Sequence, residues 1–205
     1  MLLGFLVLPL LAATRADSEN IACFNNLRQL ARATLVFSDD NDGAFPPRRF
    51  PAWPAQLRDF YQRTNLLACP SEGPGGASLS FTNADGARRS YIMNGWNDYF
   101  YAHGQQPFST NPVPVSAILM PSATVLFGEK ITESFHFWMD LDSFDDLLDV
   151  EQGRHFSAKP SRGAGGSNHA FVDGSVRLLK FGSGFEPINL WAVEPEWRNY
   201  SIPLP

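Results

Sequence analysis

Hydrophobic positions near the start of the chain predict one long helix with two different halves. The opening segment, MLLGFLVLPLLAA, carries no charge. A one-sided apolar stripe then recurs every three or four residues, at Cys23, Leu27, Leu30, Thr34 and Phe37. This spacing is typical of a helix that packs one face on a protein core. We therefore expect a helix from Phe5 to about Phe37, apolar all round before Arg15 and one-sided after it.

A cluster of turn-forming residues predicts the end of this helix. The segment from Ser38 to Gly43 reads SDDNDG, and Pro46-Pro47 follows it. Asn, Asp and Gly favour turns and left-handed backbone conformations, and proline cannot continue a helix. The segment also resembles a calcium loop, but Arg49 stands where an EF-hand requires Glu. We interpret it as a turn, and we expect a short helix from Trp53 to Tyr61 after it.

Short apolar runs predict strands in the rest of the chain. They cover Ser90–Asn94, Ala123–Glu129 and two segments that flank Asp173-Gly174. An Asp-Gly pair between two such runs favours a type I′ hairpin, with Val172 opposite Ser175. Because the runs lack the alternating helices of a parallel sheet, we expect an antiparallel sheet against one helix. The fold class is α+β, with a helical part at 1–38 and a globular part at 39–205.

The apolar start of the chain bears on the compartment and leaves several interpretations open. It is too short to cross a bilayer, which needs about 20 apolar residues. A signal peptide would have a similar apolar core, but no Lys or Arg precedes it here. The segment could also be the end of a longer membrane helix, or a buried core helix.

The two cysteines, Cys23 and Cys69, do not form the paired spacing of a zinc or redox centre. They either form a disulfide in an oxidising compartment or remain two buried thiols. The formal charge of −5 and the pI of about 5.3 argue against a nucleic-acid partner, which requires a basic face.

Candidate chemistry is sparse. An acidic run supplies possible calcium ligands, although it could equally be a solvated loop. Its candidate ligands are Asp140, Asp142, Asp145 and Asp146. The four histidines lack a metal-binding spacing, and no G-x-S-x-G motif is present. Seventeen Phe and five Trp could line a sugar-binding face, but such residues more often fill a core. We expect no catalytic residue and no cofactor other than this candidate calcium.

Several segments together resemble one family when taken in order. The segments are Pro9, Ile21–Leu30, Asp40–Pro47, Cys69-Pro70-Ser71, Ser90–Asn94, Pro121–Glu129 and Gly165–Gly174. They are similar to those of pilin-like proteins with a prepilin-type processing-associated domain, which are related to type II secretion pseudopilins. The residues that carry the hairpin part of the resemblance are Asn168, Phe171, Asp173 and Gly174.

The resemblance implies a non-enzymatic structural subunit of a pseudopilus-like or type IV pilus-like assembly. It implies an exported globular domain, anchored at the inner membrane and in contact with other pilin-like subunits. The implied anchor and assembly surface comprises Phe5, Leu6, Leu8, Pro9, Leu10 and Leu11. The alternative is a cell-surface adhesin or carbohydrate-binding module on the same scaffold.

The chain departs from the family pattern at two places. The leader, the cleavage site and the family's glutamate have no counterpart. We therefore expect either a natural chain that begins earlier or a paralogue that is not processed in the usual way. The family also has a His followed by nine residues and then Asp-Gly, and the corresponding position in this chain is Gly163. Arg154-His155 fits the family's Arg-His pair only if eight residues are inserted after it.

Overall fold

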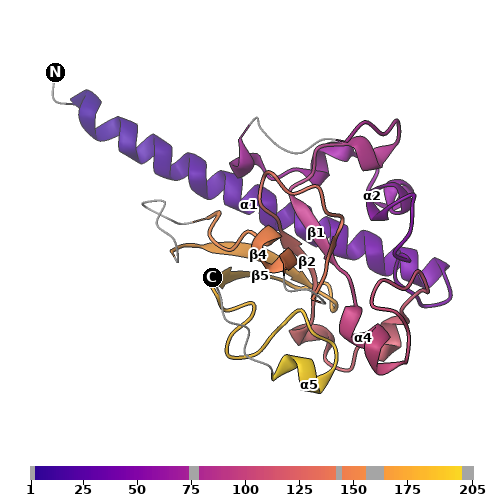
Figure 1. Cartoon of the computed structure of the whole chain (residues 1–205). Helices are drawn as coiled ribbons and strands as arrows, with labels where there is room; N and C mark the ends of the chain where they lie inside the picture. Colours follow the sequence, from indigo (N-terminus) through magenta and orange to yellow (C-terminus); the bar gives the residue numbers. More distant parts are fainter. Residues whose placement is uncertain (1–2, 74–78, 142–144, 156–163, 200–205) are drawn as a thin grey trace.

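The computed structural model describes residues 3–73, 79–141, 145–155 and 164–199, and for residues 3–13 and 145 it describes the backbone. The chain forms one long helix, α1, that lies along a five-stranded sheet, with short helices around it (Figure 1). The predicted α+β class is confirmed.

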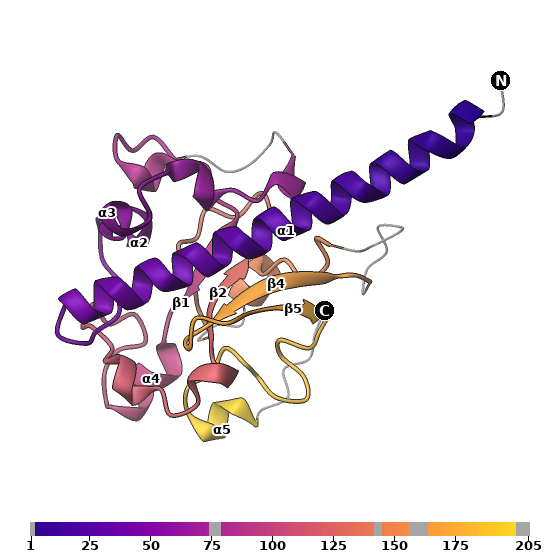
Figure 2. The same ribbon diagram turned by 180° about the vertical axis from the view of Figure 1, so that it is seen from behind.

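Helix α1 spans Leu3–Asp40 and is continuous through Pro9. Its 38 residues make it the longest element among those that the structure describes. The predicted stripe faces the protein: Cys23, Leu27, Leu30 and Thr34 are fully buried. The N-terminal part of α1 continues beyond the sheet and away from the rest of the chain (Figures 1 and 2). The two halves of α1 therefore have different surroundings, as the hydrophobic pattern predicts.

The predicted turn ends α1. The amide of Gly43 donates to the carbonyl of Ser38 across 2.9 Å, and Asp42 and Gly43 adopt positive φ values of 53° and 71°. Their left-handed backbone stops the helix, because Gly and Asp tolerate this conformation better than other residues. The segment forms a turn instead of an EF-hand loop.

The sheet has the order β3-β1-β2-β4-β5. Its strands are β1 (Tyr91–Asn94), β2 (Val125–Glu129), β3 (Trp138–Met139), β4 (Gly166–Phe171) and β5 (Val176–Lys180). The pairs β1–β2, β2–β4 and β4–β5 are antiparallel, whereas β3 pairs with β1 in parallel. The sheet is therefore mixed, and the expectation of a purely antiparallel sheet is wrong at this edge. Strand β3 is too short for a detectable alternation.

The β4–β5 hairpin exists, but its predicted register is wrong by one residue. Ala170 pairs with Val176 and His169 pairs with Arg177. A type I′ turn needs positive φ at both central residues. Here Gly174 has a φ of 82° and donates to the carbonyl of Phe171, while Asp173 is outside the positive-φ region. The loop is therefore of the three-residue kind, a type I turn followed by a left-handed glycine, instead of the two-residue kind.

Short helices complete the fold. The α-helices are α2 (Trp53–Gln56), α3 (Arg58–Tyr61), α4 (Asn97–Ala102) and α5 (Pro195–Arg198). Single 3-10 turns occupy Thr64–Leu67, Pro70–Glu72, Ala84–Gly86, Val115–Ala117, Pro121–Ala123 and Asp145–Asp149. The helix expected from Trp53 to Tyr61 is thus divided into α2 and α3.

Side chains from the two faces of the sheet enter two separate cores. On one face, Tyr91 and Met93 join the buried stripe of α1 in what we call the helix-side core. On the other face, Ile92 and Phe171 join Trp191 in the C-terminal-side core. Alternate strand residues point to opposite faces, which explains this division. Both faces are covered, although the sequence predicts a cover, α1, on one face only.

The helices of the described part of the chain include none with the length and apolarity that crossing a membrane requires. The helix expected to be partly of membrane type is therefore not found as a membrane span among these residues. In the sequence, Arg15, Asp17 and Glu19 follow closely on the apolar run. Membrane anchoring stays a prediction.

Candidate functional site

A disulfide between Cys23 and Cys69 joins α1 to the segment that enters the Pro70–Glu72 turn. The two Cα atoms lie 5.0 Å apart, and both side chains are fully buried. The bond closes a loop with a sequence separation of 46. In the chain-entropy model a cross-link over such a loop stabilises the fold by about 4 kcal/mol. Of the two interpretations left open by the sequence, the structure contains the disulfide.

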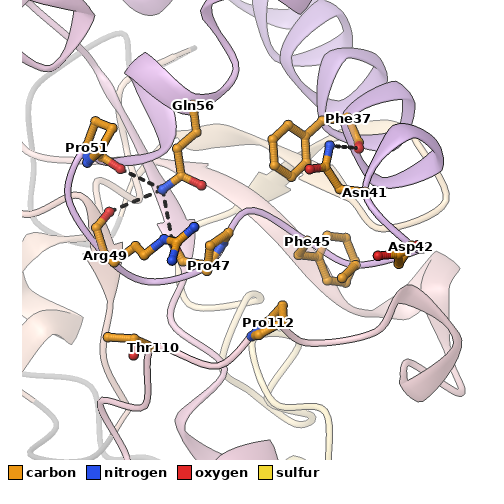
Figure 3. A pocket seen from close by; sticks show the side chains of 11 residues that line it. Phe37, Asn41, Asp42, Phe45, Pro47, Arg49, Pro51, Gln56, Thr110 and Pro112 are labelled. Atoms are coloured by element: carbon orange, nitrogen blue, oxygen red, sulfur yellow. Dashed lines mark hydrogen bonds between the residues drawn. The ribbon is translucent and has the colours of Figure 1, made fainter.

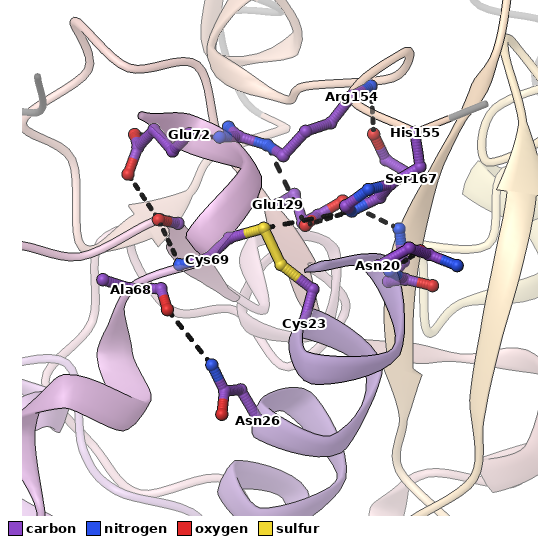
Figure 4. The surroundings of a disulfide bond; sticks show 12 residues. Asn20, Cys23, Asn26, Ala68, Cys69, Glu72, Glu129, Arg154, His155 and Ser167 are labelled. Carbon is purple, nitrogen blue, oxygen red and sulfur yellow. Dashed lines mark hydrogen bonds and ion pairs between the residues drawn. A yellow bond between two sulfur atoms is a disulfide. The ribbon is translucent and has the colours of Figure 1, made fainter. Parts of the chain in front are cut away.

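A buried group of charged side chains surrounds this disulfide (Figure 4). Nε2 of His155 lies 3.0 Å from Oε1 of Glu129 and 4.0 Å from Sγ of Cys69. The Arg154 guanidinium approaches both Glu129, at 3.8 Å, and Glu72, at 3.9 Å. We call Glu72, Glu129, Arg154 and His155 the buried ionic cluster. Because buried charges are costly unless paired, these residues hold one another in place.

Strand ends and a backbone bridge position the cluster. Glu129 is the last residue of β2, and its Oε2 accepts the amide of Asn168 on β4 at 2.9 Å. His155 and Gly166 exchange backbone hydrogen bonds of 2.8 and 3.0 Å. Ser90 completes the arrangement, since its hydroxyl donates to Glu72 and accepts the amide of Cys69. The sheet thus fixes the carboxylates, and the bridge to β4 fixes the histidine.

Two asparagines of α1 connect the helix to the same region. Asn20 accepts a hydrogen bond of 2.8 Å from the side chain of Asn168, and Asn26 donates one of 3.1 Å to the carbonyl of Ala68. Cys23 lies between them and is the first buried side chain of α1 among those described. The polar contacts and the disulfide therefore meet where the helix begins to pack on the protein.

Burial also changes the acidity of a neighbouring lysine. Lys130, next to Glu129, is fully buried, and its ammonium donates to the carbonyls of Ile131 and Ser134. Burial, which disfavours the charged form, lowers its pKa from 10.5 to about 8. Because these two carbonyls account for the position of the ammonium, we assign the lysine no chemical role.

The predicted calcium ligands do not form one shared site among the described residues. Arg48 makes an ion pair with Asp140, and Asn97 donates to the same carboxylate at 2.9 Å. Asp146 instead lies 2.8 Å from Nδ1 of His136, which is also 3.0 Å from Asp149. Asp142 and the side chain of Asp145 lie outside the described residues. Cationic or histidine partners therefore occupy the two described candidates.

The family-motif residues have structural roles in the hairpin. Asn168 is buried and contacts α1, and Phe171 fills the C-terminal-side core. Oδ1 of Asp173 accepts hydrogen bonds from the amide and the hydroxyl of Ser175, and Gly174 supplies the left-handed turn residue. The anchor residues Phe5, Leu6, Leu8, Pro9, Leu10 and Leu11 lie in the N-terminal part of α1, with side chains outside the described set.

A cavity of about 500 Å³ lies beside the C-terminal end of α1 (Figure 3). Phe37, Phe45 and prolines form much of its wall, and Nε2 of Gln56 lies within hydrogen-bond distance of the carbonyls of Pro47, Arg49 and Pro51. Asp42 and Arg49 are its only charged lining residues among those described. No nucleophile–base pair is found among these described lining residues.

Sequence reasoning missed most of the buried ionic cluster. No sequence pattern marked Glu72 or Glu129 as a site residue. Arg154-His155 was noticed only through the resemblance to pilin-like proteins. The structure brings His155 next to β4 through Gly166, although Gly163 occupies the family position for histidine. Gly163 itself lies outside the described residues.

Comparison with known proteins adds no assignment: no family model, no curated protein and no solved structure matches this chain. The resemblance to pilin-like proteins therefore stays a prediction.

Proposed function

We propose that this protein is a structural, non-enzymatic subunit of a pseudopilus-like or type IV pilus-like assembly. The observation that supports this proposal is the division of α1. Its C-terminal half packs on the sheet, and its N-terminal half extends beyond the globular part (Figures 1 and 2). A projecting helix offers a surface that a single copy leaves uncovered. Copies that pack such helices head to tail form an open filament.

The sequence of the projecting half suits this role. From Leu3 to Ala13 the chain is uncharged, so about three successive turns of helix carry no charge. We propose that this segment, with Phe5 to Leu11 as its assembly surface, packs against equivalent segments of other subunits. Before assembly it is held at the inner membrane. The disulfide at Cys23 and Cys69 supports an exported location, because oxidising compartments preserve such bonds.

Crosslinking in the source organism tests the proposal. The protein is expressed from its natural locus, upstream sequence included, with a photo-reactive amino acid in place of Leu6. We expect membrane-associated multimers that contain this chain, and we expect the double variant Leu8→Arg/Leu11→Arg to abolish them. Val36→Arg is the matched control, because Val36 is exposed at the other end of α1. Monomers in the soluble cytoplasm with reduced cysteines would refute both assembly and export.

One surface supports a second candidate, a carbohydrate-binding module on the same scaffold. Phe50, Phe81 and Phe108 are 62%, 45% and 51% exposed. The rings of Phe50 and Phe81 lie 5.7 Å apart, and the Arg48 guanidinium lies over Phe108 and Trp138. Exposed aromatic rings can stack on sugar rings. Glycan binding by a secreted monomer, lost in Phe50→Ala and in Trp138→Ala, would favour this candidate over assembly.

A further inference from the structure

The disulfide lies within a set of side chains that includes two further metal-ligand types. The sulfurs of Cys23 and Cys69, a carboxylate oxygen of Glu129 and a ring nitrogen of His155 all lie within 4.8 Å of one another. All four residues are buried. Figure 4 shows them converging from α1, the Cys69 segment, β2 and the bridge to β4. In the oxidised protein the two sulfurs bond to each other, so they cannot act as thiolate ligands.

The distances fit a tetrahedral zinc ion after reduction. Zinc bonds of about 2.0–2.3 Å place neighbouring ligand atoms about 3.3–3.8 Å apart. His155 Nε2 lies 3.0 Å from Glu129 Oε1 and 4.0 Å from Cys69 Sγ. These separations need only small changes. The largest movement is the separation of the two sulfurs, which side-chain rotation can supply once their bond is broken.

The surroundings also resemble those of a metal site. Glu129 is oriented by the Asn168 amide on its second oxygen, and outer partners of this kind hold metal ligands in place. Two thiolates and one carboxylate around Zn²⁺ carry one net negative charge. The Arg154 guanidinium, 3.8 Å from Glu129, is placed to offset that charge. Its Nε has no hydrogen-bond partner among the described residues.

The other candidate group is less suited to zinc. His136, Asp146 and Asp149 also lie within 4.8 Å of one another, but His136 is exposed and the group contains no sulfur. This group therefore serves as the internal control.

We propose that reduction of the Cys23–Cys69 disulfide creates a buried zinc site made by both thiolates, His155 and Glu129. A dithiol supplies two electrons and two protons, becomes a disulfide itself, and leaves two thiols in the protein. Binding of Zn²⁺ then releases both thiol protons to solvent, and zinc changes no oxidation state. His155 binds through Nε2 with its proton on Nδ1. The same two cysteines thus connect α1 to the sheet covalently when oxidised and through a metal when reduced.

Zinc titration of the full chain tests the proposal. The protein is reduced with a dithiol, desalted without oxygen, and titrated with Zn²⁺ against a coloured chelator. We expect one Zn²⁺ per reduced chain and none per oxidised chain. With Co²⁺ as the probe, we expect the intense visible bands of a tetrahedral thiolate site. His155→Gln and Glu129→Gln should each weaken zinc binding at least about tenfold, whereas His136→Asn should leave it unchanged.

Three results would overturn the proposal. The first is zinc uptake no greater in the reduced chain than in the oxidised one. The second is equal affinity in the wild type, His155→Gln and Glu129→Gln, because the cysteines would then bind zinc without the folded site. The third is loss of near-ultraviolet circular dichroism in the reduced, zinc-loaded protein. None of these results depends on whether the protein assembles into a filament.

Discussion

The two faces of the sheet are covered in different ways. On the helix side, α1 is attached by apolar packing, a disulfide and the hydrogen bond that Asn20 accepts from Asn168. On the C-terminal side, Trp191 and Phe185 cover the sheet without a covalent bond to it. There Asn94 donates to the carbonyls of Val125 and Trp191, at 2.8 and 2.7 Å. One face therefore relies on a disulfide, and the other on a large aromatic side chain with side-chain hydrogen bonds to backbone carbonyls.

The position of the disulfide explains this difference. Cys23 lies where α1 first becomes buried, so the bond stands between the projecting half and the packed half. This is the end of the packed half to which the projecting half is joined (Figure 1). A covalent bond at this position holds α1 to the globular part at the point where its packing begins.

Loss of Trp191 is the change with the largest expected effect. Trp191 is fully buried, and Trp191→Ala should lower the free energy of unfolding by about 3–5 kcal/mol through lost burial and a cavity. Trp197→Ala is the control, since Trp197 is only partly buried and stacks on Tyr101 at the surface; it should cost about 1 kcal/mol. Urea titration measures both. Equal losses would show that Trp191 is not the main support of its face.

Removal of the disulfide should cost somewhat less and act on one face. Cys23→Ala/Cys69→Ala should lower the free energy of unfolding by about 2–4 kcal/mol. Hydrogen exchange should show the earliest loss of protection in α1 near Asn20 to Leu27, with β4 and β5 less affected. A uniform loss of protection across helix and sheet would contradict the expectation that the disulfide stabilises this end of α1 locally.

A single methyl group tests how closely Trp191 packs. A Cβ at Gly128 would lie 2.6 Å from Cζ2 of Trp191, which is too close for van der Waals contact. Gly128→Ala should therefore cost about 1–3 kcal/mol. The penalty should shrink in a Trp191→Phe background, because the smaller ring lacks that atom. Thermal unfolding of the four variants in this cycle gives the coupling, and strictly additive effects would contradict the contact.

Periodic elements of this fold could be predicted, and isolated contacts could not. The stripe from Cys23 to Thr34 repeats at helical spacing, and β1 and β2 are continuous apolar runs, so both were recognisable. Strand β3 was not predicted from the sequence, because so short a segment shows no hydrophobic period. The hairpin register was predicted incorrectly, because Asp173-Gly174 is compatible with both a two-residue and a three-residue loop.

The candidate site shows the same limit. Cys23, Cys69, Glu129 and His155 are spread along the chain, and no local spacing connects them. The absence of a paired-cysteine motif bears only on a local metal-binding motif. It could not exclude ligands that the fold collects from four separate segments.

The smallest expected effect is a pH dependence that belongs to the C-terminal side. His169 on β4 is buried beside Trp191, with ring centres 6.0 Å apart, and its Nδ1 lies 3.0 Å from the carbonyl of Ser167. Burial lowers its pKa below the usual 6.5; the Ser167 carbonyl and Glu129 oppose this shift, and Arg177 adds to it. Below pH 6.5 the unfolded chain thus binds a proton at this residue that the folded chain does not.

Stability should therefore be unaffected by His169 above pH 6.5 and should fall as the pH drops below that value. Urea titrations from pH 8 to pH 5 measure this slope in the wild type and in His169→Gln, which keeps a donor for the Ser167 carbonyl but does not titrate. The slope should be shallower in the variant. His155→Gln, on the helix-side face, is the matched comparison. If His155→Gln removed the slope and His169→Gln left it unchanged, the acid-sensitive histidine would belong to the cross-linked face, and the contrast between the two faces would have to be redrawn.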